Sequence, residues 1–214
     1  MLLPTEGPWL TEAIRTSIER GRYEAREAQV ISRLLTRGQT VMEVGGGIGF
    51  LSAYCAKVAG AGRVVTYEAN PELIPVIKQV HALNGVDAEV RDSVLAEHDG
   101  ETQLHIAPAF WSSSTIEGSG VAKAGHSIRV KTERIDRALD DVKPDILIVD
   151  IEGGEQLFFN SIHSLSAKSV VIELHPKQLH PHAINAIFFR MFELGYTYDC
   201  AHSQGPVVAL TRIH

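Results

Sequence analysis

The clearest pattern along the chain is the alternation of short apolar runs with segments of helical spacing. Apolar runs bounded by Gly, Pro or Asn predict strands over residues 40–44, 63–68, 86–91, 145–150 and 169–174. Apolar residues at helical spacing predict helices over residues 10–36 (divided at Gly21), 50–59, 71–83, 155–165 and 181–194. Strands that alternate with helices indicate a parallel sheet with helices on both faces.

The end of the chain departs from this alternation. Strands are predicted over residues 196–201 and 206–211, and only a short Ser-Gln-Gly turn separates them, so they should pair antiparallel at one edge of the sheet. We therefore expect an α/β protein with a doubly wound, Rossmann-like sheet of seven strands, mostly parallel, with a C-terminal antiparallel hairpin strand.

Residues 94–140 also break the rhythm. Strands predicted over 103–107 and 127–132 flank a Ser- and Gly-rich stretch, 111–120, and a short helix is predicted over 133–139. We interpret this region as an inserted hairpin with a long loop, and long loops in compact domains often act as lids. Residues 1–37 form an N-terminal helical extension, which would cap the site or make a homodimer contact. The whole chain, 1–214, is expected to be one domain.

Composition narrows the classes of function. The chain is 44% hydrophobic and 21% charged, which is ordinary for a globular protein. A net charge of −6 argues against a nucleic-acid partner, and no apolar run is long enough to span a bilayer. The N-terminus lacks the pattern of a signal peptide. Cys55 and Cys200 have no metal or redox spacing, so reduced thiols in a cytoplasmic protein are expected.

A glycine-rich turn follows the first strand, because residues 43–49 read Glu-Val-Gly-Gly-Gly-Ile-Gly. The third glycine of the dinucleotide fingerprint would fall on Phe50, which disfavours a bound pyrophosphate. Glu43 would repel phosphates but suit a cation, and S-adenosylmethionine carries both a sulfonium and an ammonium. The turn therefore predicts an S-adenosylmethionine site formed by Glu43, Gly45, Gly47 and Gly49.

The second and third strands also end in polar residues. Glu68 stands where related sheets hold the ribose hydroxyls of a nucleoside cofactor, and Ala69 and Asn70 follow it. Asp92 and Ser93 follow the third strand, and we expect them at the adenine edge. Ligands of such sheets lie beyond the carboxyl ends of the strands, so these residues should belong to one cofactor site.

Further carboxylates follow the strand that ends at residue 150. Asp150 and Glu152 flank Ile151, so both side chains should point to one side of the strand. Neighbouring carboxylates raise one another's proton affinity. Such a pair can act as a general base, or can hold a divalent ion or a cationic methyl donor. Glu155 is explained equally well as a first-turn acid favoured by the helix dipole.

The fifth strand ends at Glu173, and His175 lies two positions beyond it. A histidine after a strand end can act as a base or contact a substrate. His180 and His182 are close to it in sequence, but the three histidines lack the spacing of a zinc site, and no metal site is predicted.

The chain resembles the FkbM-type S-adenosylmethionine-dependent methyltransferases over roughly residues 36–176. The similar segments are VMEVGGGIGFLSAYCA, VVTYEANPELIPVIKQVHALNGV, VKTERIDRAL and DILIVDIEGGEQ, followed by VVIELHP. The run from Asp150 to Glu155 is similar to the family's Asp-Val-Glu-Gly-x-Glu. The first motif differs from the family's Asp-x-Gly-x-Asn-x-Gly, because Glu43 and Gly47 stand at the Asp and Asn positions.

The resemblance implies methyl transfer to a hydroxyl oxygen, on a sugar or another small molecule. Asp150 would face the reacting centre and contact the cofactor, and Glu152, Glu173 or His175 would be the acceptor-side base or metal contact. Three alternatives stay open: an NAD(P)-dependent Rossmann oxidoreductase, a non-catalytic module that binds a nucleoside cofactor, and a nitrogen-directed methyltransferase.

Overall fold

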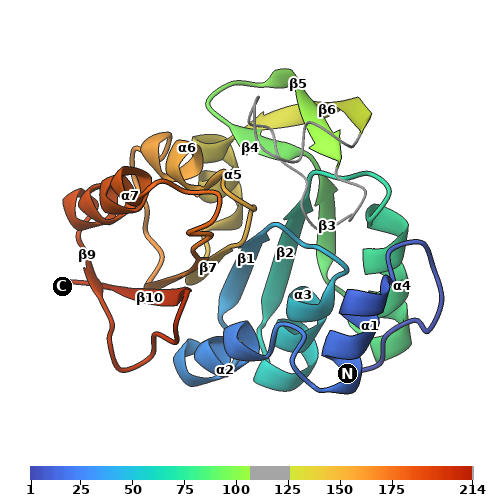
Figure 1. The fold of residues 1–214 in the computed structure, drawn as a ribbon. Helices are drawn as coiled ribbons and strands as arrows, with labels where there is room; N and C mark the ends of the chain where they lie inside the picture. The colour runs from blue at the N-terminus through green and yellow to red at the C-terminus, as the bar shows by residue number, and fades with distance from the viewer. Residues whose placement is uncertain (107–125, 214) are drawn as a thin grey trace.

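A central sheet of seven strands organises the computed structural model, which describes residues 1–106 and 126–213 (Figure 1). The strand order is β3-β2-β1-β7-β8-β10-β9. The strands are β1 Thr40–Val44, β2 Arg63–Glu68, β3 Glu89–Asp92, β7 Ile146–Val149, β8 Ser169–Glu173, β9 Tyr196–Tyr198 and β10 Val207–Arg212. The first five of these pair in parallel, whereas β10 is antiparallel to both β8 and β9. The predicted sheet, mostly parallel with a reversed C-terminal strand, is confirmed.

Helices cover both faces of this sheet. Successive side chains along each strand point to opposite faces, so each face carries apolar side chains that a helix can bury. Val41 packs into a cluster with α2 (Ala25–Leu34) and α3 (Phe50–Tyr54). Met42, its neighbour, points to the opposite face, where α5 (Ile135–Val142), α6 (Glu155–Asn160) and α7 (Pro181–Glu193) cover the sheet. Burying each large apolar side chain contributes about 1.5–3 kcal/mol, so the double-sided core holds the strand ends in fixed positions.

Several elements begin or end away from their predicted bounds. The helix predicted from Pro71 is α4, Ile74–Asn84, because the side chain of Asn70 accepts a hydrogen bond from the amide of Glu72 (3.0 Å) and forms a turn first. The helix predicted over 50–59 continues beyond α3 as a π-helical turn, Cys55–Ala59. The strand predicted over 86–91 is shorter and begins later, because β3 spans only Glu89–Asp92.

The segment between β3 and β7 forms a second, smaller sheet. Its strands are β4 Val94–Ala96, β5 Gly100–Ile106 and β6 His126–Arg134, in the order β4-β6-β5. β5 and β6 pair antiparallel, and β4 adds in parallel to β6. With three residues, β4 is too short to show a periodic pattern, which explains why it was not predicted. The loop expected at 111–120 lies outside the described residues.

The N-terminal segment lies over the glycine turn. α1 (Glu12–Glu19) follows its N-cap residue, Thr11, whose hydroxyl accepts a hydrogen bond from the amide of Ile14. Trp9 and Ile14 pack against Ile48 and Leu73, next to the glycine turn and the start of α4. Within the described ranges, no helix is long and apolar enough to cross a membrane.

Candidate active site

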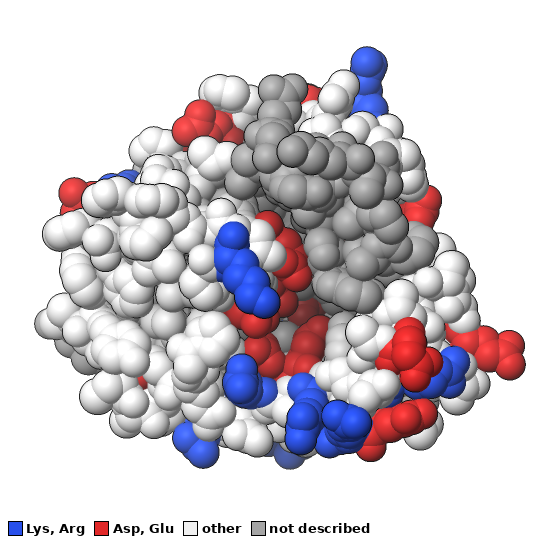
Figure 2. All heavy atoms as spheres, in the orientation of Figure 1, with Lys and Arg blue, Asp and Glu red and all other residues white. Residues whose placement is uncertain are grey.

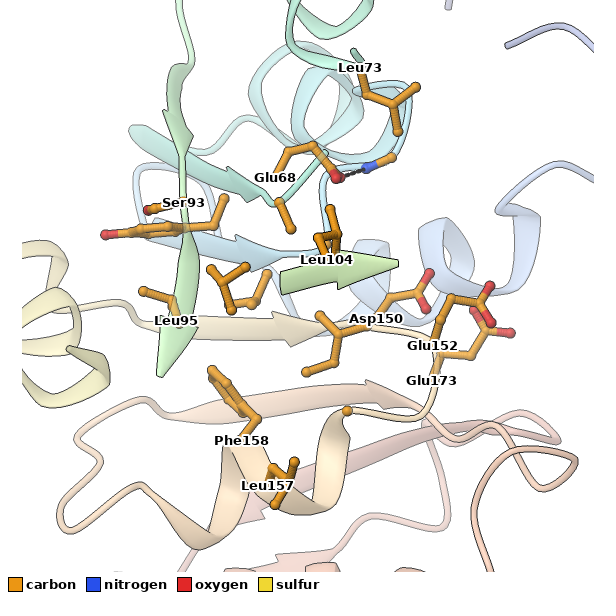
Figure 3. A pocket seen from close by; sticks show the side chains of 18 of the residues that line it. Glu68, Leu73, Ser93, Leu95, Leu104, Asp150, Glu152, Leu157, Phe158 and Glu173 are labelled. Carbon is orange, nitrogen blue, oxygen red and sulfur yellow. Dashed lines mark hydrogen bonds between the residues drawn. The ribbon is translucent and has the colours of Figure 1, made fainter. Parts of the chain in front are cut away.

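A cavity of about 1400 Å³ opens at the carboxyl ends of β1, β2, β7 and β8 (Figure 3). The connection between α1 and α2 and the small β4-β6-β5 sheet close two of its sides. Figure 2 shows the hollow, with carboxylate atoms on its floor. Small-molecule pockets usually span about 300–1,000 Å³, so this central cavity has room for a cofactor and a second molecule.

The glycine turn forms part of the wall of the central cavity. Gly45 has φ +95°, and a Cβ added there would lie 1.7 Å from the backbone oxygen of Asp150, so only glycine fits. The amides of Gly45 and Gly46 both donate to the carbonyl of Tyr67, at 2.9 and 3.0 Å. Gly49 has φ +83°, begins α3 and packs against Ile77. Close contacts of backbone with backbone therefore fix the turn.

Glu68 joins the glycine turn to the loop after β2. Its Oε2 accepts a hydrogen bond from the amide of Gly47 (2.8 Å), and its Oε1 accepts one from the amide of Asn70 (2.7 Å). Burial raises the pKa of Glu68 to about 7, although these amides favour the charged form. Each oxygen keeps a second lone pair, so the carboxylate, which lines the central cavity, can still accept from a ligand hydroxyl.

Glu43 lies behind the turn instead of in the central cavity. Alternation along β1 points its side chain towards α3, and it is 2% exposed. Burial raises the pKa of Glu43 to about 8. It is not among the described lining residues, so any effect on a ligand would pass through the turn.

Some of the other predicted cofactor residues line the central cavity, and the rest lie outside its described lining. Gly45, Gly47, Ala69 and Ser93 line the central cavity. Gly49, Asn70 and Asp92 are not among the described lining residues: Asn70 is fully buried in the loop after β2, and Asp92 is exposed.

Carboxylates gather at one end of the central cavity, where Figure 3 shows Asp150, Glu152 and Glu173 together. The reason predicted for the first two is wrong. β7 ends at Val149, and Glu152 has φ +50°, so a tight turn rather than strand alternation brings the two side chains together. Burial, followed by the charges of neighbouring carboxylates, raises the pKa of Asp150.

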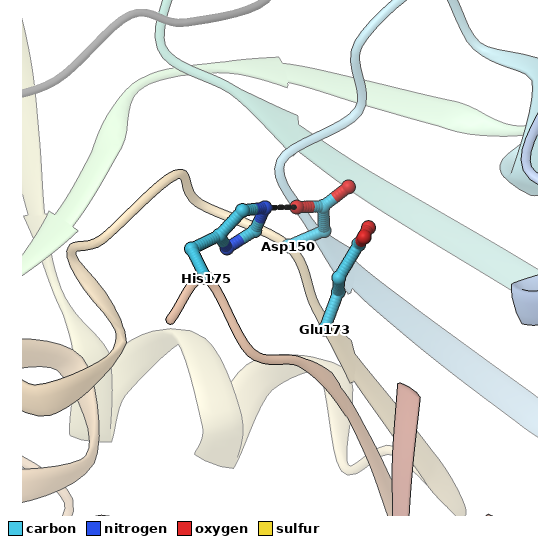
Figure 4. Close-up of side chains that lie close together, drawn as sticks. All are labelled: Asp150, Glu173 and His175. Carbon is cyan, nitrogen blue, oxygen red and sulfur yellow. Dashed lines mark ion pairs between the residues drawn. The ribbon is translucent and has the colours of Figure 1, made fainter. Parts of the chain in front are cut away.

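His175 lies behind these carboxylates with its side chain 12% exposed, and it is not among the described lining residues (Figure 4). Its Nδ1 is 2.5 Å from Oε1 of Glu155, and its Nε2 is 3.4 Å from Oδ1 of Asp150. Burial alone would lower the pKa of His175. The hydrogen bond with Glu155 and the charges of the neighbouring carboxylates outweigh burial and raise it.

Glu155 is therefore more than a first-turn acid. Its side chain is fully buried at the start of α6, where it holds the imidazole of His175. The sequence offers no local signal for this contact, because the two residues belong to segments that meet only in the folded chain.

Tyr23, Glu24 and Glu27 also line the central cavity, and the sequence analysis missed them as site residues. They lie just after the break at Gly21, which is the one local signal in this segment. Burial raises the pKa of Tyr23 and of Glu24 well above the usual values, and it also raises the pKa of Glu27. The N-terminal extension thus adds two carboxylates to the acidic end.

The two ends of the central cavity have different chemistry. Asp150, Glu152, Glu173, Glu24 and Glu27 form the acidic end, which attracts a cationic group. The opposite end is lined by apolar side chains that suit a flat or aliphatic group: Leu95, Leu104, Ile135 and Phe158. In the view of Figure 3, Glu68, which accepts from the amide of Gly47, lies between Leu95 and the acidic end.

Comparison with sequence families gives a match over residues 43–198 to the family described as methyltransferase FkbM domain. This range contains the glycine turn, Glu68 and the whole run from Asp150 to His175. No curated protein matches the chain.

Solved structures share the fold at low sequence identity. A ribosomal protein L11 methylase from Lactobacillus delbrueckii subsp. bulgaricus is 18% identical, with a TM-score of 0.57, over 89% of this chain and 78% of its own. Magnesium protoporphyrin IX methyltransferase from Synechocystis, with bound S-adenosylmethionine, is 13% identical, with a TM-score of 0.55, over 97% and 86%. A putative RNA methyltransferase from Pyrococcus horikoshii is 13% identical, with a TM-score of 0.54, over 91% and 85%. The acceptors in these names differ in kind, so the shared fold does not identify an acceptor.

Proposed function

Since the chain belongs to the FkbM methyltransferase family and is an S-adenosylmethionine-dependent methyltransferase, we propose that it methylates a hydroxyl oxygen of a small molecule, such as a sugar. One observation carries the proposal. The glycine turn, Glu68 and the carboxylates of Asp150 and Glu173 line a single cavity with room for two molecules.

The residues at the turn fit the cofactor. Gly45 and Gly47, which line the cavity, would let the methionine part approach the backbone, and Gly49 would support the turn from outside the described lining. Glu68 would accept from the ribose hydroxyls, and Ala69 and Ser93 would border the adenine. Glu43, Asn70 and Asp92 would support these contacts from outside the wall. When bound, S-adenosylmethionine supplies a methyl group activated by the sulfonium.

The acidic end would remove the acceptor's proton. Burial raises the pKa of both Asp150 and Glu152, which makes each a stronger base than an ordinary carboxylate. Nε2 of His175 is 3.4 Å from Asp150 and 3.6 Å from Glu152, so the imidazole in its protonated form would make ion pairs with both carboxylates. A hydroxyl acceptor needs such a base, and aligning it with the methyl group can lower the barrier by about 7–11 kcal/mol.

The charge of the cavity supports a small acceptor over a nucleic acid. Five carboxylates line the acidic end, and they would repel a phosphate backbone. Arg22 and Arg26 are the only Arg or Lys side chains among the described residues that line the cavity, and two cations are too few to balance the five acids.

The first experiment measures cofactor binding. Titration calorimetry should show binding of S-adenosylhomocysteine and S-adenosylmethionine but not of NADH. Binding of NADH alone would support an oxidoreductase and contradict the proposal.

The second experiment identifies the methylated atom. The protein is incubated with methyl-labelled S-adenosylmethionine and a panel of sugars, each beside its amino analogue. Label on oxygen supports the proposal, and label on nitrogen contradicts it. Cofactor binding with no transfer to any member of the panel would favour a non-catalytic module.

A further inference from the structure

We propose that the acidic end of the central cavity binds one divalent transition-metal ion through Asp150, Glu173 and His175 (Figure 4). Each side chain offers one ligand atom, and these atoms all lie within 4.8 Å of one another. Metal–ligand bonds of about 2.0–2.4 Å allow two ligands of one ion to lie up to roughly 4–4.8 Å apart. One ion can therefore reach all three atoms.

The orientation of His175 is that of a metal ligand. Histidines that bind metals usually donate their second ring nitrogen to a carboxylate, which fixes the ring and the tautomer. Glu155 supplies that carboxylate. Its side chain is fully buried, and its Oε1 is 2.5 Å from Nδ1 of His175. Nε2 is thereby left facing Asp150, with its lone pair directed to the acidic end.

Unpaired carboxylate oxygens provide an independent observation. Oδ1 of Asp150 and Oε2 of Glu155 are buried and accept no hydrogen bond from a described residue. The side chain of Glu155 is fully buried, and its other oxygen contacts Nδ1 of His175. A buried carboxylate oxygen without a partner is costly, and a nearby cation would offset that cost.

The ligand set indicates the kind of cation. Imidazole nitrogen suits Zn²⁺, Fe²⁺ and related ions, whereas Mg²⁺ and Ca²⁺ prefer all-oxygen sites. One nitrogen and two carboxylates therefore favour Mn²⁺, Fe²⁺ or Zn²⁺. An organic ammonium would also be attracted by the charge and would donate to the lone pair of Nε2, so direct measurement of Mn²⁺ binding is what separates the two kinds of cation.

Three protein ligands leave coordination positions open. A hydroxyl bound at an open position would lose its proton more readily, because a metal ion lowers the pKa of a bound oxygen. This role rests on the proposed function, whereas the existence of the site does not.

The test measures Mn²⁺ binding to the full chain after treatment with a chelator. Electron paramagnetic resonance measures the unbound Mn²⁺, and the loss of that signal on adding protein should correspond to one bound ion per chain. Glu173→Gln should weaken binding at least about tenfold, since it removes a charged ligand. Glu193→Gln, on an exposed and distant part of α7, is the matched control and should bind as the parent does. No stoichiometric binding, or equal binding by Glu173→Gln, would overturn the proposal.

Two further variants test the histidine. Pulsed resonance should detect coordinated nitrogen in the parent, and His175→Ala should abolish that signal. Glu155→Gln should keep the nitrogen signal but weaken binding about 10- to 100-fold, as expected of a residue that positions a ligand. A nitrogen signal that survives in His175→Ala would contradict the ligand set.

Binding of S-adenosylhomocysteine separates this proposal from the proposed function. Variants that lose Mn²⁺ but still bind S-adenosylhomocysteine are folded and support the site. If the parent binds Mn²⁺ but no S-adenosylhomocysteine, the metal site stands and the proposed function fails. If it binds S-adenosylhomocysteine but neither Mn²⁺ nor Zn²⁺, the metal site fails and the proposed function stands.

Discussion

The carboxylate of Glu68 accepts a hydrogen bond from the backbone amide of Gly47, with 2.8 Å between the two heavy atoms. The sequence presents the glycine turn and the end of β2 as two separate signals. This hydrogen bond joins them into one wall of the central cavity. A loss of the Glu68 charge should therefore affect both the turn and any ligand that lies on it.

The first prediction concerns Glu68→Gln. We expect the affinity for S-adenosylhomocysteine to fall about 10- to 100-fold, because a hydrogen bond to a charged group contributes about 1.5–3 kcal/mol. Titration calorimetry measures the change, and Glu72→Gln, an exposed neighbour outside the described lining, is the control. Unchanged affinity in Glu68→Gln would remove Glu68 from the cofactor site.

The second prediction concerns Gly45→Ala. Both Gly45 and Gly85 have positive φ, but a Cβ at Gly85 meets nothing within 4 Å, whereas one at Gly45 strikes the carbonyl of Asp150. We expect Gly85→Ala to lower the free energy of unfolding by about 1–2 kcal/mol, from backbone strain alone. Gly45→Ala should lower it by more than about 3 kcal/mol. Urea denaturation measures both, and equal losses would show that the contact with Asp150 is unimportant.

The third prediction concerns pH and Glu43. Burial raises the pKa of Glu43 in the folded chain to about 8, from an ordinary value of 4.5. Between these values the folded chain holds a proton that the unfolded chain has lost. Glu43 therefore makes the free energy of unfolding fall as pH rises, by up to about 1.4 kcal/mol per pH unit.

Glu43→Gln should remove this part of the pH dependence. Urea denaturation of both proteins from about pH 5 to about pH 8 should show a steeper decline for the parent. Parallel curves would mean that Glu43 is ionised in the folded chain throughout this range.

The fourth prediction concerns Asp150→Asn. If Asp150 acts on the acceptor or holds a metal ion beside it, turnover should fall about 10²- to 10⁴-fold. The affinity for S-adenosylhomocysteine should change much less, because the glycine turn and Glu68 are retained. Asp140→Asn, exposed on α5, is the control. Equal losses of turnover and cofactor affinity would make Asp150 a cofactor contact rather than a reacting group.

Patterns within short segments predicted the sheet and much of the cavity wall. The apolar run of β7, the glycine turn and the closing hairpin each follow from local rules of strand alternation and turn geometry. Since parallel strands end at the same edge of a sheet, the expectation that residues after different strands would meet required no further information.

Local patterns failed where contacts depend on distant segments. A turn at Glu152 replaced the strand alternation that was expected to bring Asp150 and Glu152 together, and β4 exists because β6 offers it a partner. Only long-range packing decides such cases, because the competing local preferences differ by little.

The sequence by itself determined the succession of strands and helices along the chain and the glycine-rich turn after the first strand, because period, turn residues and connection lengths act over neighbouring positions. The tertiary structure alone decided that Glu27 of the N-terminal extension would join Glu173, that Glu155 would hold His175, and that Glu43 would face away from the cavity. These relationships arise when α2 and α6 pack on the sheet, and no pattern within either helix encodes which side chains its partner presents.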